Sequence, residues 1–316
     1  MNDLILHHYD TSPFSEKVRL ILGYKKLPWK SVHIPPVMPK PDVVALTGGY
    51  RKTPFLQIGS DIYCDSALIC DVLEHVRPEP TLYPPHLKGA CRIFAQWADH
   101  TLFWAAMGYN LQPKGAMHMF KGDMNLAKAF GADRTATGAA SVRLRPGDAT
   151  SAYRSYLRRI ASMADEHDFL FGMDPCVADF AAYHGIWFTQ TQVPPLADIL
   201  QATPSVLEWT KRMAAIGHGP MTKLASGEAI AIAAATEPQP AGANLLVDSA
   251  FQDDHGIPLG TRVTVAAEQF GIEPTEGDLI AATRTHYSLR RIDERAGLLH
   301  VHFPRLGYSL RAADKG

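Results

Sequence analysis

The chain has 316 residues, a length that exceeds one compact core and predicts two or three domains. Hydrophobic residues make up 46% and charged residues 20%, which excludes a disordered chain and indicates a folded soluble protein. With 31 Lys plus Arg against 32 Asp plus Glu, the net charge of -1 excludes a general electrostatic attraction to nucleic acid or to an anionic membrane and favours a small neutral or zwitterionic ligand.

The sequence predicts no targeting segment. Its start, Met1-Asn2-Asp3, lacks the basic region and apolar run of a signal peptide, and no stretch is apolar for long enough to cross a bilayer. We therefore expect a cytoplasmic protein without membrane or nucleic-acid partners. The four cysteines are scattered, without the paired spacings of a zinc site, and are expected to be free, mostly buried thiols. They are Cys64, Cys70, Cys91 and Cys176.

The first segment predicts a β-α-β unit. Leu4–His8 is expected to form a strand, and Thr11-Ser12-Pro13 supplies a hydroxyl cap and a proline for the first turn of a helix. This helix is expected to run to about Tyr24, and Trp29–Ile34 to return to extended structure.

A β-β-α unit is expected next, beyond a proline-rich loop at 35–41. Phe55–Ile58 and Ile62–Tyr63 are short strand candidates, joined by the hairpin-turn sequence Gly59-Ser60-Asp61. Asp65-Ser66 then begins a helix that ends near His75. The two units in this order predict an α/β, thioredoxin-like domain over residues 1–85.

An all-α helical domain is expected over residues 86–236, after a proline-rich linker. Apolar residues recur there at helical spacing in four segments. These segments are Lys88–Leu111, Tyr153–Ala164, Asp179–Phe188 and Pro204–Ile216. Between the first two, Lys114–Thr150 has weak periodicity and several glycines, so it holds either short helices or a mobile cover for a site.

Residues 242–316 change to short β-type runs after the linker Pro238–Gly242. Five runs are separated by turn signals. They are Arg262–Ala266, Asp278–Thr283, His286–Ile292, Leu298–Phe303 and Tyr308–Arg311. We expect a small β-rich C-terminal module, a meander or barrel of about five strands, that forms a unit separate from the first two domains.

The segment Tyr9–Leu20 places the Ser12 hydroxyl at a helix N-terminus. Unpaired backbone N–H groups and the helix dipole favour negative charge there, so a thiol held beside Ser12 would ionise more readily. Ser12 is alternatively only the cap of the helix.

Two further motifs suit a peptide-like ligand. Lys52-Thr53-Pro54 precedes a strand, where a cis proline exposes the preceding backbone to an extended peptide; we predict this cis bond, although a proline is also an ordinary strand boundary. Asp65-Ser66 places a carboxylate and a hydroxyl at a second helix N-terminus. They suit the charged ends of a γ-glutamyl group, or simply cap the helix.

With these motifs in this order, residues 4 to about 225 resemble the glutathione S-transferase superfamily, most closely its Ser-type, omega- and tau-like bacterial members. The resemblance implies that Ser12 is the catalytic residue, with Tyr9 as the rival because some members use a tyrosine at the end of the first strand. It also implies a set of contacts to glutathione as cosubstrate. They are Lys52, Thr53, Pro54, Asp65 and Ser66. Neither Ser12 nor Ser15 is a thiol, which excludes a dithiol mechanism.

In the helical domain, Phe171–Phe180 resembles the family segment in which a capping box begins a buried helix. Cys176 replaces the usual hydroxyl, Asp179 is expected to be structural, and Asp174 is an alternative source of the cap. The family places its second-substrate pocket along the helix that carries three large residues here, which are alternatively plain core. They are Trp104, Met107 and Tyr109.

The resemblance implies an enzyme that conjugates the glutathione thiolate to a small hydrophobic electrophile, commonly as a homodimer. The alternative is a non-catalytic protein that binds glutathione or senses thiols, in which the C-terminal module recognises a partner. The identity of the electrophile does not follow from the sequence.

Histidines do not predict a metal site. His7 and His8 are adjacent on a strand and point to opposite faces, so they cannot readily hold one ion. His300 and His302 share a face but lack an identifiable third ligand. We therefore expect no metal.

Overall fold

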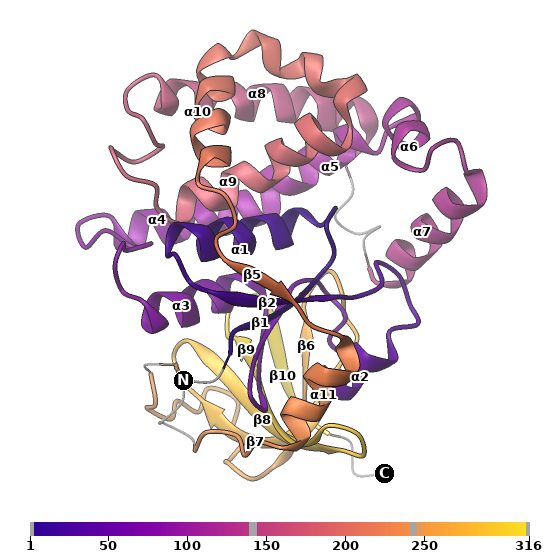
Figure 1. The fold of residues 1–316 in the computed structure, drawn as a ribbon, viewed down its shortest axis with the longest axis vertical. Helices are drawn as coiled ribbons and strands as arrows, with labels where there is room; N and C mark the ends of the chain where they lie inside the picture. Colours follow the sequence, from indigo (N-terminus) through magenta and orange to yellow (C-terminus); the bar gives the residue numbers. More distant parts are fainter. Residues whose placement is uncertain (1–2, 139–143, 241–244, 247, 314–316) are drawn as a thin grey trace.

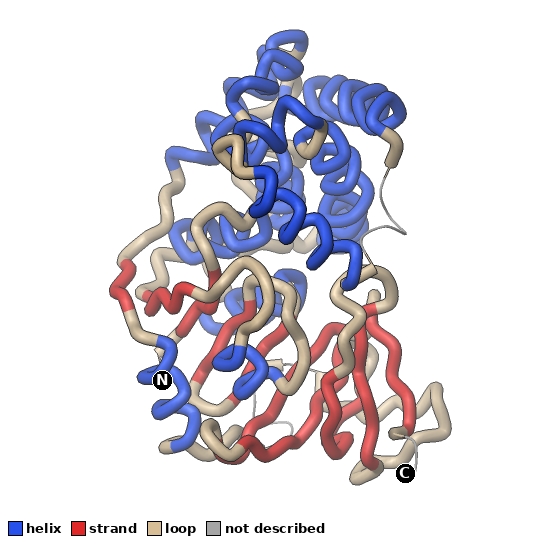
Figure 2. The backbone as a smooth tube through the Cα atoms, turned by 90° about the vertical axis from the view of Figure 1, so that its right-hand side faces the viewer, coloured by secondary structure: helices blue, strands red, loops and turns tan. Residues whose placement is uncertain are grey.

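The computed structural model describes residues 3–138, 144–240, 245–246 and 248–313, and it sets a layer of helices on a long mixed sheet (Figure 1). The strands follow the order β10-β6-β7-β8-β9-β4-β3-β1-β2-β5. Figure 2 shows the strands gathered in the lower half and the helical domain above them. The expected fold class is confirmed: a thioredoxin-like part, a helical part and C-terminal strands. No helix among the described residues is long and apolar enough to span a membrane.

The N-terminal elements match the expected β-α-β and β-β-α units. They are β1 (Ile5–His8), α1 (Pro13–Tyr24), β2 (Trp29–His33), β3 (Phe55–Ile58), β4 (Asp61–Cys64) and α3 (Ser66–Val76). Strand β1 pairs in parallel with β2 and antiparallel with β3, and β3 pairs antiparallel with β4. The segment after the proline-rich loop forms a short helix that the sequence did not predict, α2 (Pro41–Thr47), which ends at Gly48 with a φ of 79°.

The helical part covers the face of the sheet that carries α1 and α3 (Figure 1). Among the described residues its helices, with two π-helical turns and one 3-10 helix, are α4 (Lys88–Trp97), η1 (Ala98–Leu102), α5 (Phe103–Asn110), α6 (Pro113–Met119), α7 (Met124–Ala136), α8 (Pro146–Ala164), α9 (Val177–Trp187), η3 (Phe188–Gln192), η4 (Pro194–Ala202) and α10 (Pro204–Ala215). One core joins this part to the N-terminal part: Val18 and Ile21 of α1 belong to the same buried cluster as Phe180 and Trp209. All four cysteines are free and buried, as expected.

The short helices α6 and α7 lie in the stretch Lys114–Thr150, for which the sequence allowed either short helices or a mobile cover. Helix α7 contacts the N-terminal part, because the Asp133 carboxylate accepts hydrogen bonds from Arg51 at 2.5 Å and from the Met38 N–H at 3.3 Å. Whether this stretch moves as a cover stays a prediction, and residues 139–143 lie outside the described residues.

The C-terminal strands form where the sequence predicts them, but they are not a unit apart from the rest. They are β6 (Arg262–Ala267), β7 (Thr275–Ala282), β8 (His286–Asp293), β9 (Gly297–Pro304) and β10 (Tyr308–Ala312). Strand β9 pairs in parallel with β4, matching Ile62 with Val301, so one continuous sheet runs through both parts. The expectation of a separate unit is wrong because β4 presents free backbone N–H and C=O groups at the sheet edge, and β9 satisfies them.

Two smaller elements, β5 (Met221–Lys223) and α11 (Ser226–Ala234), connect the helical part to the C-terminal strands. Strand β5 pairs in parallel with β2 at the opposite edge of the sheet, and α11 packs near α2 and β9. Both elements thus tie the linker region to the sheet. The boundaries predicted for three domains, at residues 1–85, 86–236 and 242–316, stay predictions.

Three buried histidines sit in the sheet in their neutral form. His7 donates from Nε2 to the Gln57 side chain at 2.8 Å, and burial lowers its pKa to about 4. Burial, with the Arg19 charge second, lowers the pKa of His8 to about 3, and burial lowers the pKa of His286 to about 4. Each is buried, with at most 2% of its surface exposed.

These histidines predict a loss of stability in mild acid. The unfolded chain takes up their protons near the ordinary histidine pKa, whereas the folded chain does so only near pH 4 for His7 and His286 and near pH 3 for His8, so the unfolded state binds more protons between those values. As pH falls through this window, each histidine should remove up to about 1.4 kcal/mol of unfolding free energy per pH unit. Urea unfolding at pH 7 and pH 5.5 measures this loss. His286→Asn should reduce it, and exposed His167→Asn is the matched control; equal stability of the wild type at both pH values would contradict the prediction.

Candidate functional site

Strand register brings the three predicted motifs together at the same end of the neighbouring strands β1, β3 and β4. Ser12 follows the end of β1, and Thr53-Pro54 precedes β3, whose first residue Phe55 pairs with His7 near the end of β1. Phe55 also pairs with Cys64, the last residue of β4, and Asp65-Ser66 comes directly after it. The structure therefore gathers the ends of β1 and β4 and the start of β3, with the residues predicted to bind the ligand.

Ser12 is the cap of α1, and its hydroxyl retains a hydrogen-bond donor. Its Oγ accepts the Ser15 N–H at 3.2 Å, and only 2% of the residue is exposed. A hydroxyl that accepts in this way still has its own O–H to donate. Capping and ligand binding are thus compatible roles for Ser12.

Two hydroxyls close to the motifs have no partner among the described residues. They are the buried Oγ of Ser15 and the buried Oγ1 of Thr53. The Thr53–Pro54 peptide bond is cis, as predicted. Buried hydroxyls without partners are unfavourable, and both of these belong to the segments predicted to bind the ligand.

Asp65 and Lys52 lie together at the rim of the site. One Asp65 oxygen caps α3 by accepting the Ala67 N–H at 3.0 Å, and the other lies 3.6 Å from the Lys52 ammonium. About a quarter of each side chain is exposed, 25% for Asp65 and 22% for Lys52, so a ligand can reach both. The contact of Lys52 with glutathione that the resemblance implies stays a prediction.

A buried ion-pair network runs from Ser66 into the helical part. The Lys17 ammonium donates to Ser66 Oγ at 3.3 Å and to Asp99 at 2.5 Å, and Asp99 also contacts His184 Nε2 at 3.0 Å. Burial acts to lower the pKa of Lys17, but the Asp99 charge raises it overall; burial acts to raise the pKa of Asp99, but Lys17 and His184 lower it overall. Because Ser66 Oγ accepts from Lys17, its O–H is free to donate to a ligand.

Sequence reasoning missed this network. Lys17 stands inside the motif around Ser12, but a lysine on a helix is ordinarily exposed, whereas 1% of its side chain is exposed here. Asp99 and His184 come from the turn η1 and from α9, and no short-range spacing connects them to Lys17.

Of the two candidate hydroxyls, Ser12 has the more suitable surroundings. Tyr9 packs against the core on the face of the sheet with Val43 and Leu46. Helix α1, which begins after Ser12, packs into the other core, through Val18 for example. The Tyr9 ring therefore faces a different layer of the molecule from the helix start.

The three large residues of α5 do not share one role. Met107 is buried, and the Tyr109 hydroxyl donates to the Leu196 carbonyl, so both stabilise the helical part. Trp104 is half-buried and packs edge-on against Phe270, with ring centroids 5.5 Å apart. The expected place of Trp104 beside a second-substrate pocket stays a prediction.

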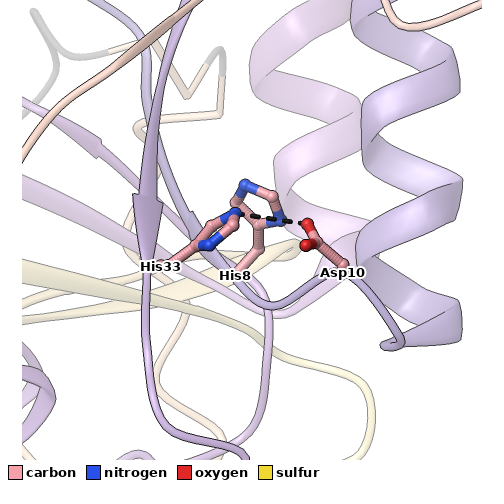
Figure 3. A group of neighbouring side chains, drawn as sticks. All are labelled: His8, Asp10 and His33. Atoms are coloured by element: carbon pink, nitrogen blue, oxygen red, sulfur yellow. Dashed lines mark ion pairs between the residues drawn. The ribbon is translucent and has the colours of Figure 1, made fainter.

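A cluster of His8, Asp10 and His33 has the donor types of a metal site (Figure 3). The candidate ligand atoms lie within 4.8 Å of one another, and Asp10 pairs with His33 at 3.2 Å. Both ring nitrogens of His8 are engaged, however, with Ser31 Oγ at 2.8 Å and with the Arg19 guanidinium at 3.1 Å. A guanidinium so close to a ligand nitrogen repels a cation, so we assign no metal here.

Comparison with known proteins identifies relatives of each part. The family model described as glutathione S-transferase, N-terminal domain, matches residues 6–81. The crystal structure of a GST-like protein from Pseudomonas syringae is 40% identical, with a TM-score of 0.82, and the match covers 99% of this chain and 100% of that one. FtsZ-localized protein A from Caulobacter vibrioides is 26% identical over 182 residues, 56% of this chain and 73% of that protein.

A more distant structure matches only part of this chain. A glutathione S-transferase from Methylobacillus flagellatus, solved with glutathione bound, is 20% identical with a TM-score of 0.51. The match covers 69% of this chain but 100% of that one. This similarity concerns the fold alone, whereas the Pseudomonas syringae protein matches nearly the whole chain.

Proposed function

Because the chain belongs to the glutathione S-transferase-like family, we propose that it binds glutathione and conjugates its thiolate to a small hydrophobic electrophile. One observation carries this proposal: Ser12, Thr53-Pro54 and Asp65-Ser66 lie together at the same end of strands β1, β3 and β4. These groups suit successive parts of an extended γ-glutamyl peptide.

In the proposed reaction, the Ser12 O–H donates to the glutathione sulfur and stabilises the thiolate, while the thiol proton passes to solvent. The N-terminus of α1 adds its partial positive charge. The thiolate attacks the electrophile, a sulfur–carbon bond forms, and a leaving group departs with its electron pair. The Thr53 backbone, the Asp65-Ser66 pair and Lys52 hold the cysteinyl, γ-glutamyl and glycyl parts.

The other candidate function is non-catalytic binding. Two observations favour it: the similarity to FtsZ-localized protein A, a name that describes localisation, and the contact of Phe270 with Trp104 beside the expected pocket. In this case the protein would bind glutathione or a partner protein without turning over an electrophile.

A two-step experiment separates these functions. Retention on immobilised glutathione followed by turnover of 1-chloro-2,4-dinitrobenzene, or of a panel of other electrophiles, supports the transferase. Binding without turnover of any of them supports the second candidate. A protein that is not retained on immobilised glutathione contradicts glutathione binding altogether. The homodimer and the cytoplasmic location are also proposals, which light scattering and cell fractionation test.

A further inference from the structure

The C-terminal strands curl back to the rim of the proposed glutathione site. In the sheet order β10 is separated from β4 by β9, β8, β7 and β6. Tyr308, the first residue of β10, nevertheless donates from its hydroxyl to the Asp65 carboxylate, which directly follows β4, at 2.8 Å. The curl therefore delivers a buried tyrosine to a residue of the site.

Tyr308 fixes Asp65 without using up its capacity to bind a ligand. Burial, with the Asp65 charge second, raises the pKa of Tyr308 well above its ordinary value, so the hydroxyl stays protonated and donates. The carboxylate has room for about four hydrogen bonds, and Ala67 N–H and Tyr308 take two, with Lys52 at 3.6 Å. At least one acceptor position remains for a ligand ammonium.

Lys52 is held by the same strands. Its ammonium lies 4.7 Å from the centre of the Tyr308 ring. A Cβ added to Gly271, in the connection between β6 and β7, would lie only 2.6 Å from the Lys52 side chain. Lys52 and Asp65 thus share one wall, which is made by residues of the C-terminal strands.

The connection between β6 and β7 also contacts the helical part. Phe270 packs on Trp104, the Gln269 amide oxygen contacts His100 Nε2 at 2.5 Å, and the Gly271 N–H donates to the Thr137 carbonyl at 2.9 Å. These contacts fix the connection between β6 and β7 against the helical part, while Tyr308 contacts Asp65 on the other side of the proposed site.

We propose that the C-terminal strands complete the glutathione site, and that Tyr308 is a positioning residue that orients the Asp65 carboxylate toward the ammonium of the γ-glutamyl group. The inference rests on the proposed function. It gives the C-terminal strands a role in substrate recognition beyond attachment to the sheet edge.

The test is Tyr308→Phe, which keeps the ring and removes the hydroxyl. We expect the dissociation constant and the KM for glutathione to rise roughly 5- to 30-fold with kcat little changed, because the lost hydrogen bond acts on binding through Asp65. Tyr287→Phe is the matched control, since Tyr287 is buried on β8 and packs near His255 and Arg305. In an Asp65→Asn background the effect of Tyr308→Phe should vanish.

A second measurement uses the wild-type protein and a glutathione analogue that lacks the γ-glutamyl amino group. Calorimetry should show that the wild type binds the analogue more weakly than glutathione. Tyr308→Phe should make this difference in affinity smaller. Wild-type binding of glutathione with no preference over the analogue, or with no effect of Tyr308→Phe, overturns the inference and leaves the proposed function standing. Absence of glutathione binding by the wild type overturns both.

Discussion

Replacement of Ser12 by alanine is expected to lower turnover of an electrophile roughly 10- to 1000-fold, the range typical of losing one positioned donor in a catalytic site. The Ser12 Oγ accepts the Ser15 N–H, so its O–H is directed elsewhere and can stabilise the thiolate. Glutathione affinity should stay nearly unchanged, because Asp65, Ser66 and Thr53 remain. The pH dependence of turnover should move to higher pH as the pKa of the bound thiol rises, and calorimetry follows binding separately.

Three variants control this experiment. Ser15→Ala removes the neighbouring hydroxyl but keeps the backbone N–H that Ser12 accepts, so it separates the two serines. Ser12→Cys should shift the chemistry toward mixed-disulfide exchange, because a thiol at a helix N-terminus is itself activated. Full activity of Ser12→Ala together with an inactive Tyr9→Phe would move the catalytic role to Tyr9. Full activity of both would contradict side-chain activation at this helix start.

Elements that depend on local signals were predictable from the sequence. The hydroxyl cap and the proline at Thr11-Ser12-Pro13, followed by an apolar helical face, predict α1 directly after the strand β1. The turn at Gly59-Ser60-Asp61 predicts the hairpin of β3 and β4. The alternating runs near the C-terminus predict β6 to β10 for the same reason. Such signals act over a few residues, so they define elements but not the partners of those elements.

Long-range pairing was not predictable in this way. The parallel pairing of Ile62 with Val301 joins segments more than two hundred residues apart, and neither strand carries a signal that names the other. The same limit applies to the site: Ser12, Thr53 and Asp65 stand in recognisable local motifs, whereas Tyr308 appears in the sequence as one more residue of an alternating strand. Curling of the sheet, which the local pattern does not encode, turns that residue toward the site.

The C-terminal strands also bear on the two candidate functions. Attachment to the sheet edge alone would require only the pairing of β9 with β4. Contacts of Phe270 with Trp104 and of Tyr308 with Asp65 add residues at the second-substrate side and at the γ-glutamyl side. Under the proposed transferase function, residues on both sides would limit the size of the electrophile; under the non-catalytic candidate, Phe270 would occupy the place of the second substrate.

Replacement of Asp179 by alanine is expected to lower the free energy of unfolding by about 3–5 kcal/mol, because three buried donors lose their acceptor together. The Asp179 carboxylate accepts the Leu170 N–H at 2.8 Å, the Cys176 N–H at 3.0 Å and the Trp209 indole N–H at 2.9 Å. It therefore joins the start of α9 to the preceding loop and to α10, which accounts for the structural role expected of it.

Asp174→Ala is the matched control, because Asp174 is an exposed acidic residue of the same loop and was the alternative cap in the sequence. The N–H of Cys176 donates to Asp179, so the loss of Asp174 should change the unfolding free energy by no more than about 0.5 kcal/mol. Urea unfolding of the two variants beside the wild type measures both effects. If Asp174→Ala lowered the unfolding free energy as much as Asp179→Ala or more, the helix start would depend on Asp174 and the prediction would be wrong. The hydrogen bonds instead place the anchor of α9 at Asp179, because its carboxylate binds the preceding loop, the helix start and α10 at once.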